Sequence, residues 1–235
     1  MRTKSAWSRA VACLGTAGVI AATSLGARAA IVINEVFPGG GSSTVTTTSY
    51  TRDFVELFNT NSLAADLTGY KLQYFSASGT SPVTIFNFGT GSVIGANDSL
   101  LIVTGGAGSQ GAAITGTATD GTNGTGSGAS LSASSGSVRL IDLTGTVVDL
   151  LGYGSVTTSN FEGTLASGGP STNDKSFQRN ATHTDTNNNA NDFTLATPTP
   201  NTGTTSSAVV AAVPEPGSLG LLGVALLGLR RRRRS

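Results

Sequence analysis

Short apolar runs separated by polar turns fill the middle of the chain, from residue 30 to 198. Gly, Asn, Ser and Thr clusters bound these runs, and no apolar stripe with the 3.6-residue helical period lasts longer than a turn or two. We therefore predict an all-β domain, a β-sandwich with under about 10% helix. The seven expected strands are Ile31–Phe37, Asp53–Asn59, Tyr70–Ser76, Thr84–Phe88, Ser99–Gly105, Ser137–Leu143 and Thr146–Tyr153.

Two further segments, one inside this middle region and one directly after it, lack such runs. The stretch from Gly105 to Gly136 holds ten glycines in 32 residues and is expected to be a long surface loop with one short strand around Ile114. Residues 199–212 are polar and then weakly apolar, as in a linker. About 170 residues can bury close to 70% of their unfolded surface, so residues 30–198 can form an independent core.

Charge is unevenly distributed along the chain. Charged residues make up 11% of it, against about 25% in ordinary globular proteins, which excludes a coiled coil. Nine of the 14 basic residues lie in the two terminal segments, so the middle holds five basic and 12 acidic side chains, a formal charge of about −7. Because nucleic-acid binding depends on Lys and Arg displacing counterions, no nucleic-acid partner is expected.

The first 29 residues have the layout of a secretory signal peptide. A basic segment precedes an apolar run over residues 10–27, and Ala27-Arg28-Ala29 supplies a small-x-small site. We expect a signal helix that engages the export machinery, with signal peptidase cutting between Ala29 and Ala30. The alternative is a retained membrane anchor, which three hydroxyl residues and three glycines in the run disfavour.

Three elements follow one another at the C-terminal end. Residues 217–229 are apolar, and as a helix these 13 residues reach about 20 Å, short of the roughly 30 Å hydrocarbon core. Arginine side chains can extend that reach, and a block of them marks the cytoplasmic side. We predict a sorting tail at 213–235 with a short transmembrane helix at about 217–229. Its polar elements are Val213, Pro214, Glu215 and Pro216 before the helix, and Arg230, Arg231, Arg232, Arg233 and Arg234 after it.

This order of elements resembles the PEP-CTERM sorting signal of Gram-negative bacteria. In that family a membrane protease, the exosortase, recognises the Pro-Glu-Pro segment and removes or replaces the tail. The resemblance implies an exported protein that passes through an inner-membrane intermediate and ends at the cell surface or in the extracellular matrix. Signal peptidase, the export machinery and an exosortase-like protease are then its partners.

The middle region resembles the lamin-tail domain, an immunoglobulin-like sandwich. The resemblance implies a binding or scaffold module. The family usually closes with Pro-Gly-Asn, where this chain has Pro200-Asn201-Thr202. The blocks that carry the resemblance are IVINEVFPGGG (Ile31–Gly41), DFVELFN (Asp53–Asn59), DLTGYKLQY (Asp66–Tyr74), VVDLLGYG (Val147–Gly154), FEGT (Phe161–Thr164) and TDTNNNANDFTLATPTP (Thr184–Pro200).

Two glutamates lie on apolar faces of the expected strands. By period-2 alternation Glu35 shares a face with Ile31, Ile33 and Phe37, and Glu56 lies between aromatic neighbours. Such a pair could serve as the acid and base of a glycosidase if the carboxyl groups are about 5 to 9 Å apart. The favoured interpretation is structural: each glutamate accepts hydrogen bonds at a sheet edge.

Other catalytic arrangements are disfavoured. The single cysteine, Cys13, lies in the signal segment, so the exported chain has no disulfide, thiolate nucleophile or Cys-ligated zinc. His183 is the only histidine, no G-x-S-x-G surrounds a serine, and His183 is expected to be a solvated loop residue. The glycine-rich segments lack the lysine and helix of a phosphate-binding loop.

One loop carries oxygen ligands at alternate positions. Residues 185–189 match the start of a D-x-[DN]-x-[DN] calcium loop, but alanines replace its turn glycine and its bidentate glutamate. The pattern suggests a calcium site formed by Asp185, Asn187, Asn189 and Asp192. The favoured alternative is a turn whose Asn and Asp side chains bond their own backbone.

Two functional hypotheses result. The first is a non-enzymatic surface or matrix protein whose sandwich binds or assembles, with exopolysaccharide as a candidate partner and no cofactor. The second is a hydrolase of an extracellular polymer that uses Glu35 and Glu56. The absence of a Cys, of a histidine network and of a serine elbow favours the first.

Overall fold

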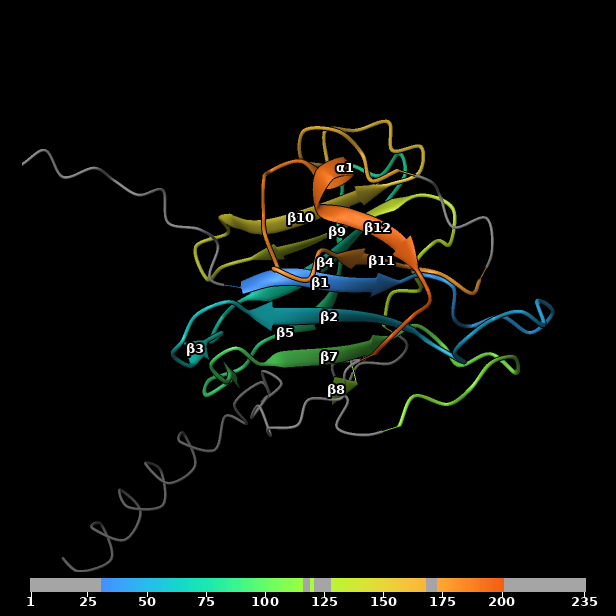
Figure 1. Ribbon diagram of the computed structural model, residues 1–235, viewed down its shortest axis with the longest axis horizontal. Coiled ribbons are helices and arrows are strands. Elements are labelled where there is room, and N and C mark those ends of the chain that lie inside the picture. Colours follow the sequence, from blue (N-terminus) through green and yellow to red (C-terminus); the bar gives the residue numbers. More distant parts are fainter. Residues whose placement is uncertain (1–30, 116–118, 121–127, 168–172, 201–235) are drawn as a thin grey trace, which may run out of the picture.

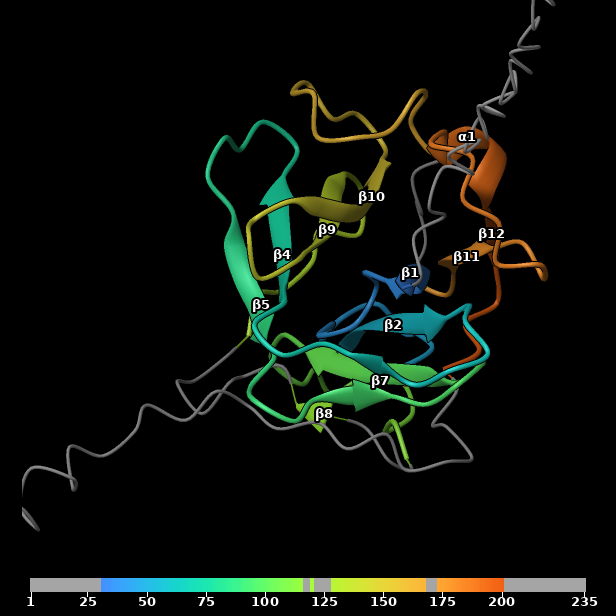
Figure 2. The same ribbon diagram turned by 90° about the vertical axis from the view of Figure 1, so that its left-hand side faces the viewer.

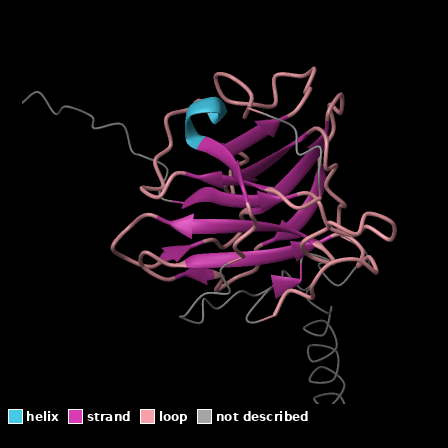
Figure 3. Cartoon of the chain, turned by 45° about the vertical axis from the view of Figure 1, so that its right-hand side comes forward, coloured by secondary structure: helices cyan, strands magenta, loops and turns pink. Residues whose placement is uncertain are grey.

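Two β-sheets packed face to face form the body of the protein. The structure is a computed structural model that describes residues 31–115, 119–120, 128–167 and 173–200. Figure 1 shows the strands of both sheets, and Figure 2, turned by 90°, shows the sheets as separate layers. Figure 3 shows how strands dominate the described chain, whose only helix is the four-residue α1 (Asn189–Asp192). The predicted all-β, immunoglobulin-like sandwich is confirmed.

The larger sheet has six strands. Every neighbouring pair is antiparallel except the last, which is parallel. The order across the sheet is β12 (Phe193–Ala196), β11 (Ser176–Arg179), β1 (Ile31–Phe37), β2 (Asp53–Asn59), β7 (Ser99–Thr104) and β8 (Thr119–Asp120).

The smaller sheet has four antiparallel strands, and a separate two-stranded ribbon accompanies it. The order in the four-stranded sheet is β10 (Val147–Tyr153), β9 (Gly136–Ile141), β4 (Lys71–Ser76) and β5 (Val83–Asn87). The ribbon joins β3 (Ala65–Asp66) to β6 (Val93–Ile94).

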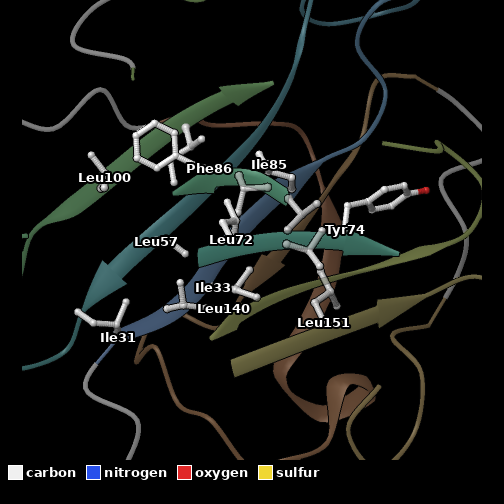
Figure 4. Close-up of a cluster of buried hydrophobic side chains, with 14 of the residues drawn as sticks. Ile31, Ile33, Leu57, Leu72, Tyr74, Ile85, Phe86, Leu100, Leu140 and Leu151 are labelled. Atoms are coloured by element: carbon white, nitrogen blue, oxygen red, sulfur yellow. The ribbon is translucent and has the colours of Figure 1, made fainter. Parts of the chain in front are cut away.

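The main core lies between the two sheets, where alternate residues of the strands face one another (Figure 4). Aliphatic side chains from both sheets, such as Leu57 and Ile102 opposite Leu72 and Leu140, are fully buried there. Burying one such side chain contributes about 1.5–3 kcal/mol, so this core can hold the fold without disulfides.

A second apolar cluster lies on the other face of the six-stranded sheet. It consists of Phe37, Phe54, Leu101 and Val103, with Tyr50 and Ile114 packed against it. The Phe37 and Phe54 rings are stacked with centroids 5.4 Å apart. This cluster explains how the glycine-rich segment is held: Ile114 contributes to it, whereas the short strand expected around Ile114 is instead β8, at Thr119–Asp120.

All seven predicted strands are present, with ends shifted by at most two residues. The sequence did not indicate β11, β12 or the two-residue strands. The predicted signal helix (1–29) and transmembrane helix (about 217–229) lie outside the described residues, and the domain boundaries stay predictions. Over the described ranges, no helix is long and apolar enough to cross a membrane.

A β-bulge in β1 corrects the predicted faces of that strand. The register with β2 shifts between Ile33 and Glu35, so Ile31, Ile33 and Val36 enter the main core while Glu35 and Phe37 face the other side. The prediction that Glu35 shares a face with Ile31 and Ile33 is therefore wrong, because alternation skips one residue at a bulge. Its predicted position at a sheet edge is also wrong, since β1 and β2 lie inside the sheet.

Candidate functional sites

A buried arginine lies at the centre of a group of carboxylates at one end of the sandwich. Arg179 on β11 places Nη2 2.6 Å from Oδ2 of Asp149 on β10. Its Nη1 lies 3.4 Å from Oδ2 of Asp192 on α1 and 3.8 Å from Oδ1 of Asp185 in the loop before α1. The guanidinium also stacks over the ring of Phe193, 4.4 Å from its centroid.

The ion pair bonds the peptide groups of Ile33, next to the bulge in β1. The register of β1 with β11 covers only Glu35 and Val36, and at Ile33 side chains take the place of a strand partner on that side. The Ile33 N–H donates to Asp149 Oδ2 at 2.5 Å, and Arg179 Nε donates to the Ile33 carbonyl at 2.8 Å. Because β1 and β10 belong to different sheets, Asp149 and Arg179 also join the two layers.

Negative charge exceeds positive charge in this group. One oxygen each of Asp149, Glu162 and Asp185 lie within 4.8 Å of one another. The pKa of Glu162 is raised to about 8, first by burial and then by the carboxylates of Asp149 and Asp185, while Arg179 acts to lower it. Burial likewise raises the pKa of Asp149 to about 6, although Arg179 and the Ile33 N–H act to lower it. The group can therefore hold a proton near neutral pH, and its three oxygens are also suited to a hard cation.

Only part of the predicted calcium site comes together. Asp185 and Asp192 both face Arg179. Asn187 has a positive φ of 54°, and its N–H donates to Asp185 Oδ1 at 2.9 Å, the self-bonded turn that was the alternative. Asp149 and Glu162, which complete the carboxylate group, were missed, although an aspartate inside the apolar run of β10 was a signal. Calcium binding at these residues stays a prediction.

Asn189 lies apart from the other predicted ligands and has a structural role. Its Oδ1 accepts N–H groups of Gly152 (2.8 Å) and Glu162 (3.1 Å), and its Nδ2 donates to the Leu150 carbonyl at 2.7 Å. The amide thus pairs with the outer edge of β10 as a peptide group of another strand would. Both lone pairs of Oδ1 are used, so Asn189 is poorly placed to bind an ion.

A second polar group lies on the outer face of the six-stranded sheet, where Glu35 and Glu56 are direct cross-strand neighbours, each 2% exposed. Asn34 Nδ2 donates to Glu56 Oε1 at 2.7 Å, so its Oδ1 is left to accept from His183 Nδ1, also at 2.7 Å. The sequence placed the two glutamates on strands, but the bulge brings them into register.

His183 is not the solvated loop residue that the sequence predicted. Its ring stacks on Phe58 with centroids 3.7 Å apart, and its backbone has a positive φ of 50°. Burial, and then the charge of Arg179, lower its pKa. The sequence around His183 is polar and gives no sign of its contact with Phe58, 125 positions earlier on β2. The prediction of a solvated histidine was wrong for that reason. The stacking on Phe58 and the bond to Asn34 hold the imidazole in one orientation, and the lowered pKa favours its neutral form.

Family comparison identifies the two regions of the chain. The lamin tail domain model matches residues 25–155, more than half of the chain. The chain belongs to the lamin tail domain family. The PEP-CTERM protein-sorting motif matches residues 212–234, which confirms the resemblance of the tail. No curated protein matches the chain.

The lamin tail domain match ends before the last two strands of the sandwich. Strand β11 pairs with β1, and β12 pairs with β11, so residues beyond 155 complete the six-stranded sheet. The PEP-CTERM motif shows that the protein is exported and processed by exosortase-type sorting machinery, for the cell surface or the extracellular space.

The carboxylate group leads to a prediction about pH. Asp53 on β2, outside this group, also has a pKa that burial raises to about 7. Because the pKa values of Glu162, Asp149 and Asp53 are raised in the folded state, the folded chain binds more protons than the unfolded chain from about pH 4 to 8. Stability should therefore fall as pH rises through this range. His183 acts in the opposite direction, but only below its unfolded pKa of about 6.5.

Thermal unfolding measured from about pH 6.5 to 8.5 checks this sign, and the melting temperature should drop by a few degrees. A Glu162→Gln variant should lose much of the dependence and keep the part due to Asp53. A melting temperature that rises over this range would contradict the assignment.

Proposed function

We propose that this protein is a non-enzymatic module displayed at the cell surface or shed into the extracellular matrix, where its sandwich binds or assembles. The observation that carries the proposal is the combination in one chain of a lamin tail domain with a PEP-CTERM sorting motif. The partners act in order: the export machinery carries the chain, signal peptidase cuts between Ala29 and Ala30, and the exosortase-type protease then processes the tail. The inner membrane holds the chain transiently between these steps.

The use of the two glutamates supports a binding module over a hydrolase. Glu35 accepts the Ser176 hydroxyl at 2.6 Å and the Thr199 N–H at 2.9 Å, and Glu56 accepts from Asn34. A glycosidase needs one carboxyl group to reach the glycosidic oxygen and the other to reach the sugar ring or a water. Both carboxyl groups are buried and bonded to their own chain, so they hold the sheet together.

Exopolysaccharide is the partner that we propose for the exported domain. The described surface carries many Thr, Ser and Asn side chains, which can donate and accept hydrogen bonds with sugar hydroxyls. The overall negative charge of the domain disfavours nucleic acid, as expected from the sequence. No cofactor is required for this role.

The test is to incubate the purified protein with exopolysaccharide from the producing cells and measure cosedimentation and release of reducing ends. We expect cosedimentation without release, and a Glu35→Gln/Glu56→Gln variant that still folds should bind equally. Release of reducing ends by the wild type, lost in that variant, would instead establish the hydrolase. Absence of binding to any host glycan would refute the polysaccharide partner.

A further inference from the structure

The chain crosses the outer face of the six-stranded sheet directly after its last strand. Residues 197–200 leave β12 and pass over β11 and β1, as the orange segment below β12 shows in Figure 1. We call residues 197–200 the strap. They are the last described residues before the segment that leads to the sorting motif.

Glu35 and Gln178 hold the strap. The Thr199 N–H donates to Glu35 Oε1 at 2.9 Å, and the Thr199 hydroxyl donates to Oε2 at 3.0 Å. Gln178 Nε2 donates to the Thr197 carbonyl at 2.7 Å. Each carboxyl oxygen of Glu35 is thus bonded to the same strap residue, Thr199.

The sequence of the strap suits this attachment. Thr199 lies between Pro198 and Pro200, which have no N–H and restrict the residues before them to extended conformations. The Thr199 N–H is therefore the only backbone donor from residue 198 to 200. An extended segment of this kind loses little conformational freedom when it docks.

Because Glu35 lies on β1, it attaches the strap to an interior strand of the sheet. β12 is an edge strand that pairs only with β11, whereas β1 lies inside the sheet between β11 and β2. A pull on the C-terminal segment would peel an unattached β12 from the edge one hydrogen bond after another. With the strap in place, the same pull acts first on Thr199 and Glu35.

We propose that the strap transfers tension from the C-terminal segment to the interior strand β1 and so protects β12 from peeling. This inference rests on the proposed display through the sorting tail, because a domain held by its C-terminal segment is pulled there. It gives Glu35, a buried acid that no catalytic role requires, a function at the exit of the domain.

Hydrogen exchange of the full chain in detergent tests the attachment. We expect the Thr199 amide to be protected in the wild type, and Glu35→Ala to speed its exchange by about tenfold or more. If Glu35→Ala fails to fold, Glu35→Gln takes its place. It keeps one acceptor oxygen, so the Thr199 amide should exchange at a rate between those of the wild type and an unprotected amide. A wild-type Thr199 amide that exchanges as fast as an unprotected one would overturn the proposal.

Single-molecule pulling tests the transfer of tension. Handles are attached at the N-terminus and at a Ser206→Cys cysteine in a Cys13→Ser background, which removes the chain's only other thiol. Thr199→Pro deletes both strap donors without touching Glu35, and should lower the force of the first extension step. Thr194→Ala, at an exposed position of β12, is the matched control and should leave that force unchanged.

An equal first-step force in Thr199→Pro and wild type would overturn the proposal that the strap transfers tension to β1. Both measurements use purified protein, so their failure is separable from a failure of surface display, which is read from cell fractions. If the protein is displayed normally but the wild type and Thr199→Pro unfold at the same first-step force, the proposed function stands and the role of the strap is refuted.

Discussion

Replacing Arg179 with methionine is expected to lower the free energy of unfolding by about 3–5 kcal/mol, because it leaves buried carboxylates without their cation. The melting temperature should fall by on the order of 10 °C. The change also removes the donor that serves the Ile33 carbonyl at the β1 bulge. The loss should be smaller at pH 5 than at pH 8, since protonation neutralises the carboxylates that Arg179 now balances.

Arg139→Met is the matched control. Arg139 also stacks over a phenylalanine, with its guanidinium 4.5 Å from the Phe75 centroid, but it is partly exposed and donates to the neutral Gln73. We expect a loss of about 1 kcal/mol or less there, the usual effect of a surface substitution. Equal losses in the two variants, or an Arg179→Met loss independent of pH, would show that the carboxylate group does not depend on its arginine.

The second large effect concerns the sorting motif. Replacing Pro214, Glu215 and Pro216 with alanine should leave export intact but trap a full-length precursor in the inner membrane, because the exosortase-type protease would no longer recognise it. Replacing Arg230–Arg234 with serine should instead weaken retention, since each arginine at the membrane centre costs about 2.5–3.5 kcal/mol and the block holds the tail in place.

Immunoblots of fractionated cells that carry the sorting system measure both changes. Alanines at Thr202, Thr204 and Thr205, in the predicted linker, are the control and should mature like the wild type. If the Pro-Glu-Pro variant matures and localises normally, the segment acts as a plain anchor and is not read by a protease.

Sequence patterns predicted the strands better than the site. Runs such as Ser99–Thr104 are long and apolar, so their periodicity is visible without tertiary contacts. β11 and β12 have four residues each with polar members, and their stability comes from pairing with β1 and with each other. Strands of that kind have no local signal to detect.

The sequence did not predict the carboxylate group around Arg179, for a different reason. The bulge in β1 is one extra residue, and it decides which way Glu35 points; Asp149 bonds the peptide N–H of Ile33 next to it. Arg179 lies 30 positions from Asp149, and no spacing rule links them. Oxygens at alternate positions suit calcium, so the pattern predicts Asn189 as an ion ligand, yet the amide of Asn189 bonds the edge of β10.

The pairing of β1 with β11 has a consequence for the order of events during secretion. The first strand of the domain pairs in register with residues more than 140 positions later, Glu35 with Gln178, so closing that loop delays the completion of the sheet. A chain that crosses a membrane from its N-terminal end cannot finish this fold until almost all of it has emerged. The polypeptide therefore remains incompletely folded, and competent for translocation, until shortly before the sorting tail reaches the membrane.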